Sequence, residues 1–150
     1  MLFQRVNRTN PEKVFIVAKN SYSTASLSNG QAVIWDFATD ADGVGVTRPT
    51  ARATNAGIAV AGVAVETIAA GDYGLLQVYG YHSAVRQRIA SSADTLAPGA
   101  PIGLNAAGSV FCLEAISTAS TVVLVYPCGF SLVTSTLWTT TAAAAFLKCM

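Results

Sequence analysis

The stretch from Ala56 to His82 (AGIAVAGVAVETIAAGDYGLLQVYGYH) consists of two apolar segments separated by a polar centre that contains glycine. That centre, Ala70 to Gly74, holds two glycines and an aspartate, which suit the backbone angles of a tight turn. The pattern therefore predicts two neighbouring β-strands joined by this turn.

The first of these two strands is apolar on both faces. With a period of two residues, one face holds Ala59, Ala61, Val63 and Val65, and the other holds Ile58, Val60 and Ala64. A strand with one face in water alternates between apolar and polar side chains. We therefore expect this strand to be covered twice, once by the protein's own core and once by a companion molecule.

Other segments show strand patterns at short and regular intervals. They are Val14 to Lys19, Gln31 to Phe37, Ile102 to Leu104, Ser109 to Ala115 and Thr121 to Tyr126. We expect a long polar connection over Ala38 to Asn55 and a tight turn at Pro98-Gly99. The spacing predicts an all-β fold, a small antiparallel β-barrel or sandwich.

The two ends of the chain differ from this pattern. Residues 1 to 13 have neither a helical nor a strand period and carry the turn signal Asn10-Pro11, so we expect an extended N-terminal arm. Residues 14 to 130 then form the β-barrel domain, and residues 131 to 150 form a C-terminal tail. Within the tail, Ala142 to Lys148 is a run of good helix formers that predicts a short helix, capped by Thr139 or Thr140.

The composition adds a question about the surface. Charged residues make up 11% of the 150 residues, against about 25% in typical soluble domains. Such a chain needs either a membrane or a large protein contact area. Residues 115 to 147 carry no charge, but Pro127 and Gly129 interrupt them, and the longest strongly apolar piece, Val122 to Tyr126, has only the length of a strand. We therefore expect protein partners and no membrane.

The net charge and the reactive residues argue against nucleic-acid binding, metal binding and catalysis. A formal net charge of +1 does not favour nucleic acid as a partner. The three cysteines have no metal-ligand spacing, and no cationic start precedes an apolar block, so we expect reduced thiols and no signal peptide. His82, the only histidine, has Ser83 beside it, but adjacent strand residues point to opposite faces. We expect His82 at the surface or at an interface, no cofactor, no metal and no enzymatic activity.

Three phrases of the sequence resemble a known family. GIAVAGVAVETIAAGDYGLLQVYGYHSAV, the turn LAPGAPIGL and the strand NAAGSVFCLEA resemble the small β-barrel head decoration proteins, or capsid cement proteins, of tailed bacteriophages. The resemblance covers about residues 55 to 116, and it brings no catalytic residues with it.

The resemblance implies a structural virion protein that binds the outer surface of a phage capsid and cements neighbouring major capsid protein subunits. It implies synthesis in the host cytoplasm, the major capsid protein as partner, and self-association as a trimer or dimer. We expect the arm and the tail to act as clamps. The candidate contact residues are Leu2, Phe3, Arg5, Arg8, Tyr79, Tyr81, Trp138 and Phe146.

Other functions remain open at this point. The chain is alternatively a carbohydrate-binding virion or surface module that uses Trp35, Tyr73, Tyr79 and Tyr81. It is alternatively another structural part of the virion, such as a head fibre or a tail component. A small hydrolase centred on His82 is the weakest of these hypotheses, because the sequence offers that histidine no partner group.

Overall fold

The computed structural model describes residues 12–41, 43–49, 60–88, 95–105, 110–113, 128–134 and 140–149. This part of the chain contains nine β-strands and no helix. The strands are β1 (Lys13–Asn20), β2 (Ala32–Trp35), β3 (Gly45–Thr47), β4 (Val60–Ala64), β5 (Tyr73–Arg88), β6 (Pro101–Asn105), β7 (Val110–Leu113), β8 (Gly129–Ser131) and β9 (Thr141–Lys148). The prediction of an all-β fold is confirmed.

The nine strands form one sheet in the order β1-β3-β2-β4-β5-β7-β6-β8-β9. Two additional pairings, β1 with β5 and β5 with β9, close this sheet on itself twice. The result is two five-stranded rings that share β5. The β1–β3 and β5–β7 pairs are parallel and all other pairs are antiparallel, so the sheet is mixed where we predicted a purely antiparallel one.

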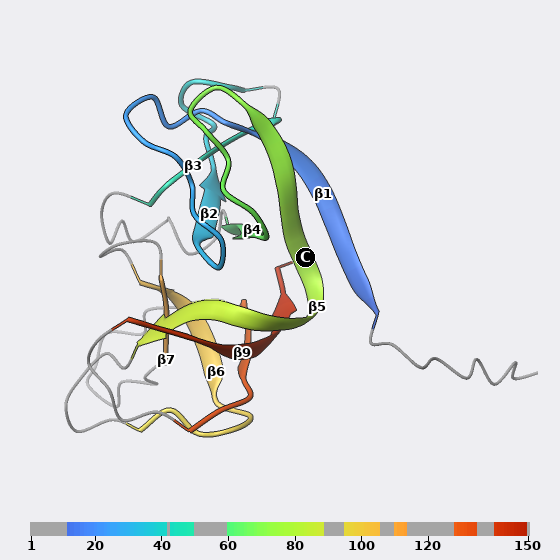
Figure 1. The fold of residues 1–150 in the computed structure, drawn as a ribbon, viewed down its shortest axis with the longest axis vertical. Helices are drawn as coiled ribbons and strands as arrows, with labels where there is room; N and C mark the ends of the chain where they lie inside the picture. The colour runs from blue at the N-terminus through green and yellow to red at the C-terminus, as the bar shows by residue number, and fades with distance from the viewer. Residues whose placement is uncertain are drawn as a thin grey trace, which may run out of the picture.

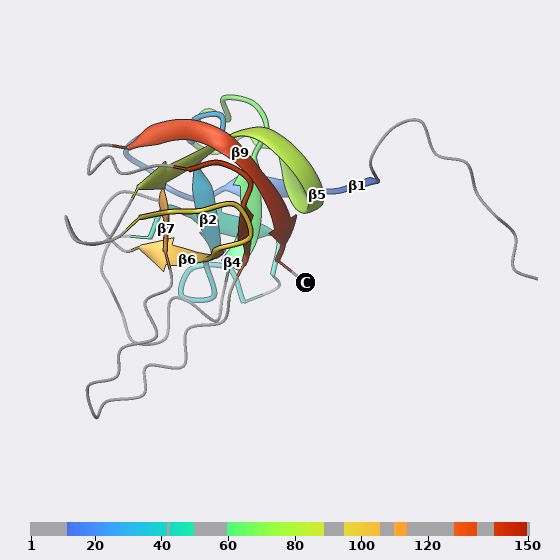
Figure 2. The same ribbon diagram turned by 90° about the horizontal axis from the view of Figure 1, so that it is seen from below.

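Strand β5 connects the two halves of the molecule. It has 16 residues, about three times the usual length of a strand. In Figure 1 it runs beside β1, bends, and continues beside β9, and Figure 2 shows the β5–β9 pair from below. Gly80 lies between the two parts of β5 and has a φ of 98°, an angle that residues with a side chain rarely adopt.

Each ring has its own buried cluster of apolar side chains. The cluster of the first ring includes Leu27, Val33 and Leu76, and that of the second includes Leu96, Ile102 and Leu147. All six side chains are fully buried. The described residues therefore form two cores, one for each ring.

Strand β4 lies between the two cores. Ala61 and Ala64 belong to the first cluster, whereas Val60 and Val63 belong to the second, and none of the four is more than 8% exposed. The prediction of two covered faces is therefore correct, but the prediction of a companion molecule as the second cover is wrong, because the second half of the same chain provides it.

The division of β4 side chains between the cores also differs from strict alternation. Val33 pairs with Gly62 and the next residue, Ile34, pairs with Val60, so one residue of β4 is skipped in the register. Such a bulge reverses the alternation of side chains between the two faces, so residues before and after it that are two apart no longer share a face. For this reason Ala61 and Val63, expected on one face, contribute to different cores.

The predicted helix at the C-terminus is wrong. Residues Thr141–Lys148 form β9, which pairs with β5 on one side and with β8 on the other. A run of alanines favours a helix in isolation by only a few tenths of a kcal/mol per residue. Pairing with strands on both sides outweighs that preference here.

The predicted connection contains a strand, and two other predicted segments lie wholly or mostly outside the described residues. The predicted connection from Ala38 to Asn55 contains β3. Residues 1–11 of the predicted arm and the predicted strand Thr121 to Tyr126 lie outside the described residues. Among the residues that are described, no helix is long and apolar enough to cross a membrane.

Candidate docking surfaces

Large apolar side chains are exposed on the outer side of the β1–β5 pair. We define the β1–β5 apolar face as Phe15, Val17, Tyr73 and Leu75, which are 43%, 61%, 64% and 41% exposed. Val17 and Leu75 are direct partners in the register of the two strands. The next residues, Ala18 and Leu76, are fully buried in the first core. The two strands thus bury one apolar set and leave a second one in contact with solvent.

A second group of aromatic side chains crosses the second ring. Tyr81 on β5 pairs with Phe146 on β9, which pairs in turn with Phe130 on β8. Tyr81 is 37% and Phe130 39% exposed, and Phe146 is half-buried. We refer to these three residues as the aromatic row.

Neighbouring groups hold the aromatic row in place. The rings of Tyr79 and Phe146 meet edge to face, with centroids 5.2 Å apart and an interplanar angle of 83°. The Lys13 ammonium group lies 5.9 Å from the centroid of the Tyr81 ring, within the range of a cation–π contact. The row therefore presents aromatic surface with a cation beside it.

The structure places only part of the predicted contact set. Tyr79, Tyr81 and Phe146 come together around the β5–β9 pair, whereas Leu2, Phe3, Arg5, Arg8 and Trp138 lie outside the described residues. Sequence reasoning missed Phe15, Val17, Leu75 and Phe130. Both alternating sets of side chains in the segment VFIVAK are mostly apolar, so the sequence does not indicate which of its residues face solvent.

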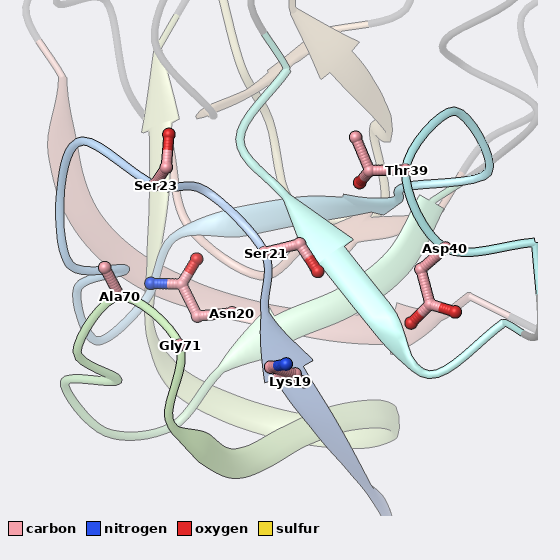
Figure 3. A pocket seen from close by; sticks show the side chains of 8 residues that line it. All are labelled: Lys19, Asn20, Ser21, Ser23, Thr39, Asp40, Ala70 and Gly71. Carbon is pink, nitrogen blue, oxygen red and sulfur yellow. The ribbon is translucent and has the colours of Figure 1, made fainter.

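A polar cleft of about 650 Å³ opens at the end of β1 (Figure 3). Its lining residues are Lys19, Asn20, Ser21, Ser23, Thr39, Asp40, Ala70 and Gly71. They come from the segment around the end of β1, the turn after β2 and the turn before β5. None of these lining residues is aromatic, so the cleft offers no platform on which a sugar ring stacks.

The amide of Asn20 in this cleft serves the fold. Its Nδ2 donates to the carbonyl oxygens of Ile68 at 3.0 Å and Ala25 at 3.2 Å, and its Oδ1 accepts the Tyr22 N–H at 3.0 Å. Asn20 is fully buried. Its side chain ties the loop after β1 to the segment that precedes β5.

His82 lies in the interior, and not at the surface or an interface as expected. Its side chain is 7% exposed, and Nδ1 accepts the N–H of Ala84 at 3.1 Å. Burial and the nearby charge of Lys13 lower the pKa of His82 below its ordinary value. Ser83 is exposed on the other side of β5, as the strand period predicts, so the two side chains form no nucleophile and base pair.

The side chains required by the carbohydrate hypothesis have unlike environments. Tyr73 is 64% exposed at the start of β5, whereas Tyr79 is half-buried against Phe146. Trp35 packs against the first core. Two of the four aromatic residues are thus partly used by the fold.

Two of the three cysteines, Cys128 and Cys149, are described with their side chains. Cys128 is buried in the second core, and Cys149 packs against that core. The Cys149 Sγ–H group donates to the carbonyl oxygen of Cys128 at 3.4 Å. Burial and the neighbouring Cys128 raise the pKa of Cys149 far above its ordinary value.

Comparison with known proteins shows a likeness in fold but none in sequence. No known protein family matches the chain, and no curated protein is significantly similar to it in sequence. Among solved structures, the chain is similar to the crystal structure of the head fiber gp8.5 N base in bacteriophage phi29, with a TM-score of 0.52 and 11% sequence identity. The match covers 92% of this chain and 96% of that chain, so the two chains share a fold over nearly their whole length.

Proposed function

We propose that this chain is a non-enzymatic structural protein of a phage head, attached to the outside of the capsid in the manner of a head-fibre base. The observation that carries this proposal is the fold shared with the phi29 head fibre base over 92% of this chain. The low content of charged residues, 11%, supports the proposal. In an assembly, partners cover part of the surface of a protein, and the covered part is poor in charged residues.

The β1–β5 apolar face is the surface that we assign to capsid contact. Its members are large apolar side chains, and Val17 and Tyr73 are more than 60% exposed. Clustered exposed apolar side chains mark contact sites on soluble proteins. Lys13 and Lys19 lie on the same strand and give this surface a cationic border that suits an acidic rim on the capsid protein.

A cement role is the finer alternative that the sequence resemblance implies. A decoration protein of that type bridges major capsid protein subunits and raises the resistance of the shell. The structural likeness to a head fibre base favours the attachment role over the cement role. Self-association as a trimer or dimer fits both roles.

Attachment is tested by co-sedimentation with capsids assembled without this protein. We expect the purified full chain to bind them with saturable stoichiometry. Replacing Leu75 with Ser weakens binding about three- to eightfold, because full burial of a leucine contributes on the order of 1.5–3 kcal/mol and a contact covers only the 41% of Leu75 that is exposed. The matched control is Leu132→Ser, since Leu132 has the same exposed fraction, 41%, but follows β8.

The outcomes separate the proposals. Failure of the wild-type chain to bind any capsid contradicts head attachment. Equal loss of binding in Leu75→Ser and Leu132→Ser contradicts the assignment of the β1–β5 apolar face and leaves attachment intact. Heat resistance of capsids with and without bound protein tests the cement role, which requires an increase.

A further inference from the structure

The two rings have the same strand order and the same strand directions. In the first ring, β1 is parallel to β3, and antiparallel pairs then lead through β2 and β4 to β5 and back to β1. In the second, β5 is parallel to β7, and antiparallel pairs lead through β6 and β8 to β9 and back to β5. Each element of the first ring thus has a counterpart, β1 to β5, β2 to β6, β3 to β7, β4 to β8 and β5 to β9.

The turns that lead into β2 and β6 are equivalent in detail. Leu27 and Leu96 are both fully buried, one in each core. Three residues later come Gly30 and Gly99, with φ angles of 77° and 85°. Each turn is closed by the same bond, from Gln31 N–H to Ser28 O at 3.1 Å and from Ala100 N–H to Ala97 O at 2.9 Å.

The same pair of main-chain bonds ties each turn to the counterpart strands β4 and β8. The Gly30 N–H donates to Ala64 O, and the Gly99 N–H donates to Ser131 O, both at 2.8 Å. In return Ala64 N–H donates to Gln31 O at 3.0 Å, and Ser131 N–H donates to Ala100 O at 2.9 Å. Two turns of the same type occur often in β proteins, but this reciprocal pair also fixes the partner strand and its register.

Buried amide side chains mark a third equivalent position. Asn20 pairs with Val46 of β3, as Gln87 pairs with Phe111 of β7. Both amides are at most 1% exposed. Asn20 donates to the main chain at Ile68, and Gln87 donates to the main chain at Ala143 and Ala144. The match therefore extends from topology to individual side chains.

We propose that the protein is a tandem repeat of one five-stranded unit in which a single strand serves both copies. Tyr73–Gly80 of β5 acts as the last strand of unit 1, and Tyr81–Arg88 acts as the first strand of unit 2. Gly80 lies at the seam between them. The fold shared with the phi29 head fibre base covers both units, but the proposal rests on the internal match and not on the proposed function.

Equivalence predicts that matched turn residues are exchangeable. The quadruple variant S28A/N29P/A97S/P98N exchanges the first two residues of one turn with those of the other and leaves the composition of the chain unchanged. Asn29 and Pro98 both immediately precede the positive-φ glycine, the second position of a turn where proline is accepted. We expect the thermal midpoint to stay within about 4 °C of wild type and the amides of Gly30, Ala64, Gly99 and Ser131 to keep their protection from hydrogen exchange.

The matched control is an out-of-phase variant, in which proline moves to the first position of the first turn instead of the second. The variant S28P/P98S also keeps the composition, but it places proline at Ser28, whose N–H donates to Gln31 Oε1 at 2.8 Å. We expect a clear fall in thermal midpoint and loss of protection at Gly30. The proposal is overturned if the in-phase and out-of-phase variants behave alike, or if the in-phase variant loses protection at the four amides.

A second in-phase exchange tests the cores independently of the turns. Val33 and Ile102 are fully buried at the counterpart positions of β2 and β6, which pair with Gly62 and Gly129. The variant V33I/I102V moves one methylene group from one core to the other. We expect its thermal midpoint also to lie within about 4 °C of wild type, and a larger fall contradicts the equivalence of the two cores.

Discussion

The α-carbon of Gly80 faces the carbonyl oxygen of Glu12 so closely that a β-carbon on residue 80 would overlap that oxygen. This contact lies where β5 passes from one ring to the other, beside the start of β1. The positive φ of Gly80 and the proximity of a neighbouring backbone both exclude a side chain. Glycine at this position thus lets β5 bend while it stays paired with β1.

Replacing Gly80 with Ala is therefore expected to destabilise the fold by about 2–4 kcal/mol, the sum of backbone strain and a displaced strand. The comparison is Gly71→Ala, because Gly71 has a similar φ of 84° but a β-carbon there would meet no atom within 4 Å. That variant loses only about 1 kcal/mol. Chemical denaturation of both variants measures the difference, and equal losses contradict the role of the Glu12 contact.

Asn20 is expected to be the most sensitive polar residue of the first ring. In Asn20→Ala the Tyr22 N–H loses its acceptor, and the carbonyls of Ala25 and Ile68 lose the amide donor, although the Ile68 carbonyl still accepts the Leu27 N–H. We expect the loss of these three hydrogen bonds to cost about 1–3 kcal/mol. Asn20→Asp keeps the acceptor for the Tyr22 N–H but places oxygen against two carbonyl oxygens, so it is destabilised at least as much. Ser23→Ala, an exposed change in the same cleft, is expected to stay within about 0.5 kcal/mol of wild type.

The stability of the protein is expected to fall in mild acid because of His82. Burial and Lys13 lower its pKa in the folded state, so below the ordinary value of 6.5 the unfolded chain takes up the proton first. Stability from this group is complete above about pH 6.5 and is lost as the pH falls towards the folded-state value. His82→Gln removes this contribution, so the difference in thermal midpoint between wild type and variant changes between about pH 7.5 and 5. A difference independent of pH contradicts this assignment.

Cys149 is expected to react slowly with thiol reagents. Its raised pKa leaves very little thiolate at neutral pH, and the thiolate is the reactive form. In a Cys112→Ser background, only Cys128 and Cys149 remain. We expect neither to be labelled by iodoacetamide at neutral pH on the time scale of free cysteine, and both to be labelled at once in denaturant. Rapid labelling of the folded chain refutes this.

The strand pattern predicts most of the fold because the strands alternate or are β-branched and glycines mark the turns. The turn at Gly71 and the strands at Lys13–Asn20 and Ala32–Trp35 lie within a few residues of the predictions. Strand β3 has three residues, which is too short for any periodic signal. It forms because β1 and β2 pair with it on both sides.

The double cover of β4 is predictable from its side chains, but the nature of the cover is not. Local sequence shows that both faces of Val60–Ala64 are apolar, whereas only topology shows that residues as distant as Ile102 and Leu147 share a cluster with Val60 and Val63. For the same reason, local sequence does not show which side chains remain exposed on the outside of the sheet. A strand period of two places Phe37 on the same face as Val33 and so predicts a core position for it, but β2 ends at Trp35 and Phe37 is 59% exposed.

The shared strand also sets an order of events during synthesis. Every strand of the first ring has left the ribosome once Gly80 has emerged, whereas the second ring cannot close until β9 is complete. A nascent chain can therefore finish its first core early, with the outward side of Val60 and Val63 bare until Ile102 and Leu147 arrive to cover it. In this interval the nascent chain exposes the apolar side chains of β4. The speed of translation after residue 80 determines how long that exposure lasts.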